Sequence, residues 1–326
     1  MEAFAYANPS SLQEAIASLG SSWDEAAVLA GGTDLISLMK QYVYTPKKVV
    51  NIKGIRELKT ITGGGDKGFR IGAAVTVDEL MKSRTLSAEF PALLLAARGI
   101  TSPQMRNMGT VGGDLCQRPR CWYYRNGLGL LATGPDGKSL VPGGENQYHA
   151  IFGHENRAYF VSASSFGPAL VSYDATLKVT SPTGSRDVKA ADFFLVPKTA
   201  DEREVDLKPN EIVTEIVLPS SRGLKSATYE VRQKEAFDWP LVTASVALRI
   251  SGGKVSEAKV TLGHVAPKPW VSDAAAKALI GQSVNEQTAE AAGAAAAQGA
   301  SPLSQNAYKV QLVKVAVKRA ILVAIG

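Results

Sequence analysis

Two consecutive glycines between an apolar run and an amphipathic run place the tightest constraint on how this chain folds. Residues 26–30 are apolar and predict a short buried strand, residues 34–41 have the apolar spacing of a helix, and Gly31 and Gly32 lie between them. Glycines allow a sharp turn and a close approach to a ligand, and free N–H groups at a helix start attract phosphate oxygens. The stretch therefore predicts either a pyrophosphate cradle or a tight turn that needs glycine only for positive φ.

A second glycine-rich loop, residues 109–114, follows a predicted helix. Two such loops in one chain favour a dinucleotide held from two sides, with the hydroxyls of Thr33 and Thr110 bonding to its phosphates. A third glycine run, residues 63–68, satisfies the pattern GxGxxG, but it joins two strand-like runs. It therefore predicts a hairpin loop and argues against NAD bound in the Rossmann manner.

The length of 326 residues exceeds what one hydrophobic core usually serves. Periodicity predicts an α+β chain in which residues 1–219 contain two subdomains, about 1–84 and 85–219, and residues 220–326 form a further domain. The later elements expected from the pattern are a helix at 91–100, strands at 169–182 and 211–219, antiparallel strands joined by a turn at 251–253, an alanine-rich helix at 288–300 and an amphipathic closing helix at 306–325.

Composition excludes several classes of protein. No run approaches the roughly 18 apolar residues of a membrane span, and the first residues do not form a secretory signal, so we expect a cytoplasmic protein without a membrane span. The net charge of +6 comes without a basic run or a recognition motif, which argues against a nucleic-acid partner. Two cysteines and three scattered histidines provide neither a disulfide framework nor a zinc motif.

Several blocks, in this order, make the sequence similar to a known family: LAGGTDLI, RIGAAVT, MRNMGTVGGDLCQRPRCWYYR, NQYHAIFG and EIVTEIVLP. They resemble the FAD-binding (medium) subunit of the xanthine dehydrogenase and aldehyde oxidoreductase family of molybdenum hydroxylases. The resemblance implies a vanillyl-alcohol-oxidase (PCMH)-type FAD-binding fold of two subdomains over residues 1–219. A C-terminal α+β domain like that of the CO dehydrogenase flavoprotein would follow.

The same resemblance implies which residues bind FAD. The first glycine stretch would wrap the pyrophosphate, the second would approach it from the other subdomain, and Ile100 and Val213 would lie near the isoalloxazine. For the apolar members a plain core role is equally expected. The implied cofactor-binding residues are Leu29, Ala30, Gly31, Gly32, Thr33, Asp34, Leu35, Ile36, Ala73, Thr76, Ile100, Gly109, Thr110, Gly112, Gly113, Asp114, Ser165 and Val213. No catalytic residue and no metal ligand is expected.

The sequence departs from the family at two positions near the expected flavin. Ser164 and Ser165 stand where relatives carry Ser-Asp, so an acidic contact to the cofactor is missing. Glu230 stands where many relatives carry lysine, which places a negative charge where a positive one favours reduced flavin. Arg232 is close enough in sequence to compensate for that charge.

Two cysteines bear on a second cofactor. In relatives that resemble the periplasmic aldehyde oxidoreductase and hydroxybenzoyl-CoA reductase flavoproteins, an insertion holds a four-iron cluster on four cysteines. The insertion is present here as residues 116–153, but Cys116 and Cys121 are its only thiols. We therefore expect no iron–sulfur cluster on this chain and two free thiols in a loop retained as structure.

The predicted function is electron transfer through FAD. The expected partners are a molybdenum-cofactor large subunit, which holds the substrate, and a small subunit with two-iron clusters, and the flavin would pass electrons to an external acceptor. Two alternatives remain open. One is a structural subunit whose flavin site has decayed, and the other is a free-standing FAD oxidoreductase.

Overall fold

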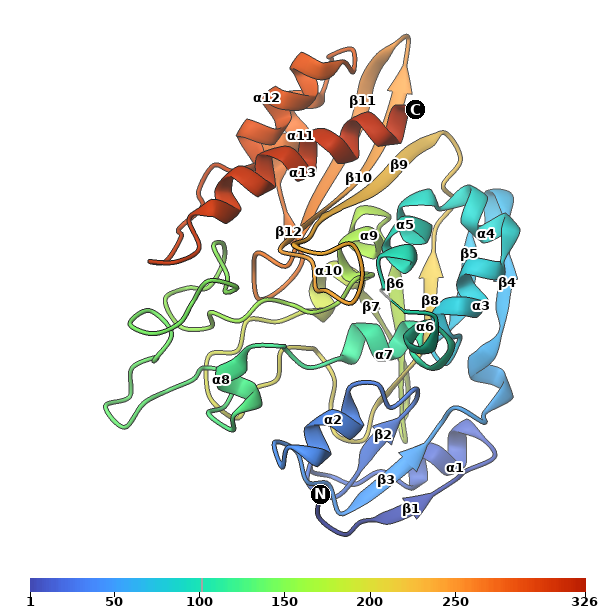
Figure 1. Ribbon diagram of the computed structural model, residues 1–326. Coiled ribbons are helices and arrows are strands. Elements are labelled where there is room, and N and C mark those ends of the chain that lie inside the picture. Colours follow the sequence, from blue (N-terminus) through green and yellow to red (C-terminus); the bar gives the residue numbers. More distant parts are fainter. Residues whose placement is uncertain (101) are drawn as a thin grey trace.

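The computed structural model describes residues 1–100 and 102–326. Its three sheets follow one another along the long dimension of the molecule in Figure 1, with the N-terminal sheet (blue) at one end and the C-terminal sheet and helices (orange and red) at the other. No helix of the described residues combines the length and the apolar character needed to cross a membrane.

The first sheet has three parallel strands in the order β1 (Ala5–Ala7), β3 (Lys48–Asn51) and β2 (Ala27–Leu29). Helices α1 (Leu12–Ala17) and α2 (Leu35–Lys40) lie in the connections between the strands, as parallel neighbours require. Because β2 ends at the sheet edge directly before the first glycine stretch, this stretch is held at the carboxyl end of a strand.

The second sheet has five antiparallel strands in the order β4 (Ile61–Gly63), β5 (Phe69–Gly72), β8 (Ile212–Leu218), β6 (Thr176–Ser181) and β7 (Gly184–Lys189). The glycine run 63–68 joins β4 to β5 as a hairpin. This confirms the predicted hairpin loop, and the run is not a Rossmann turn. The segment 1–84, expected to form the first subdomain, thus contributes strands to both sheets.

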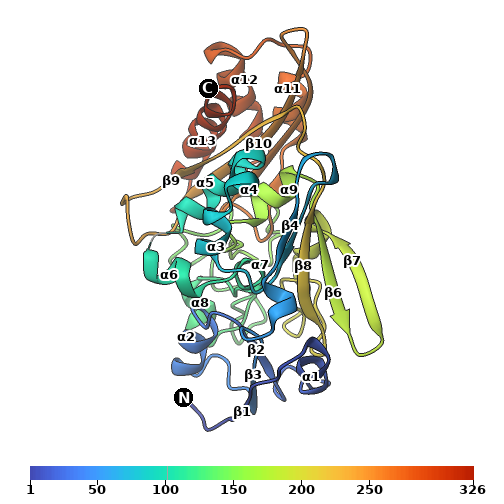
Figure 2. The same ribbon diagram turned by 90° about the vertical axis from the view of Figure 1, so that its right-hand side faces the viewer.

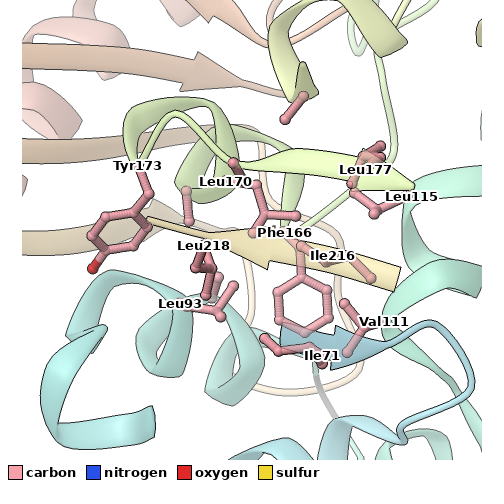
Figure 3. Packing of buried hydrophobic residues seen from close by; sticks show 14 of the residues in the cluster. Ile71, Leu93, Val111, Leu115, Phe166, Leu170, Tyr173, Leu177, Ile216 and Leu218 are labelled. Atoms are coloured by element: carbon pink, nitrogen blue, oxygen red, sulfur yellow. The ribbon is translucent and has the colours of Figure 1, made fainter. Parts of the chain in front are cut away.

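A buried apolar cluster supports the second sheet from one side. In Figure 3 the ring of Phe166 lies among Ile71 of β5, Ile216 of β8 and Val111. This core supports the elements that surround the candidate site described below. The helices of this part of the chain are α3 (Val77–Lys82), α4 (Arg84–Glu89), α5 (Pro91–Gly99), α6 (Pro103–Met108), α7 (Val111–Cys116), α8 (Trp122–Arg125), α9 (Gly167–Ser172) and α10 (Ala190–Phe193), with 3-10 turns η1 (Arg56–Lys59) and η2 (Gly65–Lys67).

Two local predictions are wrong. The second glycine stretch is a loop only up to Thr110, whose hydroxyl accepts the Gly113 amide (3.1 Å) and so begins helix α7. The start of the run 169–182 is helix α9 and not strand, because proline occupies its first turn and the Asp114 carboxylate accepts the Phe166 amide (3.0 Å) at its amino end. The strand begins only at β6.

The C-terminal domain is an antiparallel sheet covered by helices, seen from a second side in Figure 2. The strands lie in the order β12-β11-β10-β9, and Gly252 and Gly253 form the β10–β11 turn with φ of +57° and +76°, as predicted. The elements are β9 (Leu224–Val231), β10 (Val242–Ser251), β11 (Lys254–Gly263), β12 (Trp270–Val271), α11 (Asp273–Leu279), α12 (Glu286–Ala296) and α13 (Tyr308–Ile325).

Helix α13 closes the domain with the amphipathic pattern expected from its sequence. Its buried apolar residues Val313, Val317 and Ile321 recur at helical spacing and join the core of the sheet. One buried residue is charged: Lys309 is 1% exposed, and its Nζ donates to the carbonyls of Tyr148 and His264, each at 2.9 Å. Lys309 therefore joins α13, the insertion and the end of β11 at one point.

Candidate functional site

A cavity of about 420 Å³ lies where the N-terminal sheet, the segment after α5 and the C-terminal domain meet. It is bounded by the first glycine stretch, by segments of 99–120 other than Thr101, and by residues 203–213 and 237–240. Of the predicted residues, Leu29, Ile36 and Thr76 do not line it. Those that do are Ala30, Gly31, Gly32, Thr33, Asp34, Leu35, Ala73, Ile100, Gly109, Thr110, Gly112, Gly113, Asp114, Ser165 and Val213.

The three predicted residues outside the cavity have other surroundings. Leu29 is the last residue of β2, and Ile36 lies in the first turn of α2. Thr76 is the N-cap of α3, where its hydroxyl accepts the Glu79 amide and the Glu79 carboxylate accepts the Thr76 amide (2.8 Å). The Thr76 side chain therefore caps α3, while its backbone forms a β-bridge with Thr110.

The two glycines of the first stretch serve different needs. Gly32 turns the chain with φ of +73°, whereas a Cβ on Gly31 would lie 2.0 Å from the carbonyl oxygen of Met108 and 2.9 Å from Cα of Gly109. Gly31 is therefore required by close packing against the backbone of the second glycine stretch. The two stretches, far apart in sequence, form adjoining walls of one cavity.

The first stretch also presents unused hydrogen-bond donors. The backbone amides of residues 31–35 find no acceptor among the described residues, although the amide of Ile36 bonds back to Gly32 (3.2 Å). Consecutive free amides at the start of a helix make a concave site for anions such as a pyrophosphate. The stretch is thus a turn that also presents free amides, so the two readings of the sequence are not exclusive.

The second stretch contributes differently from the first. Its amides are already occupied, because Gly112 donates to the carbonyl of Ala73 (2.9 Å), Val111 to Val75 (2.9 Å) and Gly113 to Thr110. Gly112 has no room for a side chain, since a Cβ would lie 2.7 Å from that of Ala73. This stretch therefore forms a close-packed wall, while the anion-binding donors come from the first.

Asp34 turns toward the insertion. Its carboxylate accepts the backbone amide of Arg118 (2.8 Å), pairs with the guanidinium of Arg125 (2.7 Å) and lies 3.2 Å from that of Arg120. Its side chain makes no capping bond to α2. Asp34 thus fixes the insertion against the cavity and carries a neutralised charge within the cavity wall.

Asp114 is a second buried carboxylate of the wall. It accepts hydrogen bonds from the Ser164 hydroxyl (2.5 Å) and from the amides of Ser165 (3.2 Å) and Phe166. Burial raises the pKa of Asp114, and these hydrogen bonds act in the opposite direction. The Asp114 carboxylate therefore holds Ser165 at the cavity through the Ser165 backbone amide.

The Ile100 end of the cavity adjoins a buried ion pair. Glu230 pairs with Arg232, which also donates to the carbonyl of Gly99. Burial raises the pKa of Glu230 to about 7, against the opposing effect of Arg232. The pairing suggested by sequence spacing is therefore present, but Glu230 lies behind Gly99 and does not line the cavity.

Sequence reasoning missed the aromatic and arginine residues of the wall. The guanidinium of Arg120 lies 4.6 Å from the ring centroid of Trp239, and that of Arg203 lies 3.9 Å from that of Trp23. All four line the cavity. Each pair joins residues more than a hundred positions apart, so no local pattern indicated them.

The two cysteines of the insertion remain free thiols. The Sγ atom of Cys121 lies 3.1 Å from Nε2 of His149, and burial lowers the pKa of His149 to about 4, so the imidazole is neutral. Burial raises the pKa of the Cys116 thiol to about 12. Among the described residues, no group of three or more His, Cys, Asp or Glu side chains is placed to hold a metal ion.

Comparison with known proteins matches both parts of the chain. Residues 2–221 match the family described as FAD binding domain in molybdopterin dehydrogenase, and residues 227–324 match the CO dehydrogenase flavoprotein C-terminal domain. The chain belongs to the FAD-binding subunits of the molybdenum hydroxylase family. The resemblance found in the sequence, the fold class and the FAD cofactor are thereby confirmed.

Individual relatives of this family align over nearly the whole chain. The FAD-binding subunit of aldehyde oxidoreductase from Escherichia coli is 30% identical over 89% of this chain and 88% of its own length. The carbon monoxide dehydrogenase medium chain of Hydrogenophaga pseudoflava is 29% identical over 98% and 96%. In the structure of reconstituted CO dehydrogenase from Oligotropha carboxidovorans, a chain superposes with a TM-score of 0.77 at 26% identity, over 99% of this chain and 98% of that chain.

Proposed function

We propose that this FAD-binding subunit relays electrons within a molybdenum hydroxylase complex. FAD, when bound, accepts electrons and passes them on to an external acceptor. The partners would be a molybdenum-cofactor large subunit and a small subunit with two-iron clusters. We place the complex in the cytoplasm. The relatives named as medium chains and FAD-binding subunits support the role of an FAD-binding subunit in such a complex.

The observation that carries the proposal is the fit between the cavity and a dinucleotide. The free amides of residues 31–35 would bind the pyrophosphate, and Gly31 lets the backbone of the second glycine stretch pack directly against this stretch. Ile100 and Val213 would border the isoalloxazine, and Ser165 would contact the cofactor where relatives carry aspartate. We propose the fifteen lining residues as the FAD site, and we keep 1–219 and 220–326 as the two domains.

The first test is an absorption spectrum of the purified chain combined with iron quantification. We expect flavin bands near one equivalent and no iron, because two thiols cannot supply four thiolate ligands. A colourless chain that takes up no added FAD would favour a structural subunit. Stoichiometric iron would show that the insertion holds a cluster.

The relay is tested by the composition of the native complex. The tagged chain, purified from its native cells at natural expression levels, should elute with molybdenum, iron and flavin together. A chain that elutes alone with flavin and oxidises a substrate unaided would instead be a free-standing oxidoreductase.

A further inference from the structure

An arginine–aromatic stack lies at the amino end of β2. The guanidinium of Arg203 lies 3.9 Å from the ring centroid of Trp23 and 5.6 Å from that of Tyr44. The Tyr44 hydroxyl donates to the carbonyl of Trp23 (2.6 Å), which fixes the two rings relative to each other. The stack is therefore a built feature and not a chance contact of exposed side chains.

Arg203 differs from the other arginines of the cavity wall. Arg118 pairs with Glu204, and Arg120 pairs with Asp34, whereas Arg203 has no carboxylate partner among the described residues. Its charge and its planar face are thus available to a ligand. A guanidinium plane stacks well on the face of a heteroaromatic base.

The position of the stack relative to the glycine stretch sets what it can reach. Trp23, Tyr44 and Arg203 all line the cavity, and so do Ala26, Ala27, Val28 and Ala30 on the way to Gly31. An extended chain from Ala26 to Gly31 covers about 16 Å. Since Gly31 contacts Met108 and Gly109 at the other end of β2, the stack lies at the opposite end of the cavity from the second glycine stretch.

We infer that Arg203, held against Trp23, forms the stacking platform for the adenine of FAD and makes the site select FAD over FMN. A dinucleotide whose pyrophosphate lies on the amides of residues 31–35 extends its adenosine toward the amino end of β2. The small side chains Ala26 and Ala27 leave room there for a flat purine. FMN ends at its single phosphate and gains nothing from this platform.

The test is flavin titration of the full chain after removal of its flavin, followed by calorimetry and by quenching of flavin fluorescence. Wild type should bind FAD more tightly than FMN, and ADP alone should compete with FAD. Arg203→Ala should weaken FAD binding about 10- to 100-fold, as expected for one lost base stack, and leave FMN binding unchanged. Trp23→Leu should have the same selective effect.

Two further variants separate stacking from charge and from misfolding. Arg203→Lys keeps the charge without the planar face and should lose as much FAD affinity as Arg203→Ala, while Arg84→Ala, at an exposed arginine of α4, should bind FAD as wild type does. Circular dichroism of each flavin-free variant checks its fold. Equal loss of FAD and FMN, full rescue by lysine, or no competition by ADP would each overturn the inference while leaving FAD binding itself intact.

Discussion

Gly31→Ala tests whether close packing of the two glycine stretches creates the FAD site. The added Cβ would lie 2.0 Å from the Met108 carbonyl oxygen, 2.6 Å from its carbon and 2.9 Å from Cα of Gly109, whereas ordinary contact begins at 3.4 Å. All three neighbours are backbone atoms, so no side-chain rotation relieves the clash. The second stretch must retreat by about 1.4 Å, which opens the wall of the cavity.

Overpacking of this kind typically costs about 1–3 kcal/mol of folding free energy, and a shift near 1 Å at a binding site is enough to cost about 100-fold in function. We therefore expect Gly31→Ala to lower the thermal midpoint and to lose most of its FAD affinity. Gly54→Ala is the matched control, because a Cβ there meets no atom within 4 Å. The reasoning is refuted if both variants have the same thermal midpoint and retain equal amounts of flavin through gel filtration.

Two further predictions concern positions outside the cavity. Burial lowers the pKa of Lys309 from 10.5 to about 7. Between pH 7 and pH 10.5 the unfolded chain therefore carries a proton on Lys309 that the folded chain has released. The free energy of unfolding should consequently rise with pH across that window. Urea unfolding at pH 7 and pH 9 measures this rise, which should shrink in Lys309→Met. Thr76→Ala should cost about 1 kcal/mol through the lost capping box and leave the Kd for FAD unchanged; weaker FAD binding would place Thr76 in the site after all.

Local signals in the sequence predicted the elements that depend on local chemistry. Gly252 and Gly253 gave a hairpin turn, and the apolar spacing after Tyr308 gave the closing helix. Each of these structures is determined within a few residues, so neighbouring side chains suffice to specify it.

One of the two errors lies where a distant residue decides the local structure, whereas the start of α7 depends on the nearby cap Thr110. Helix α9 begins where the Asp114 carboxylate, about fifty residues earlier, receives the amides of Ser165 and Phe166. A short apolar run alone does not distinguish this helix from a strand, although Pro168 in its first turn was a usable signal. The arginine–aromatic pairs of the wall left no such signal, because only the tertiary fold joins them.

The contacts of Asp34 change how the insertion is to be understood. A carboxylate beside free amides that attract anions would repel a pyrophosphate, and the segment that begins at Arg118 supplies the cations that cancel it. The insertion therefore supplies the positive charge that offsets Asp34 beside the free amides, and it is not merely a remnant of a lost cluster site. A chain trimmed of this segment would keep its glycines and still present a negative charge to its cofactor.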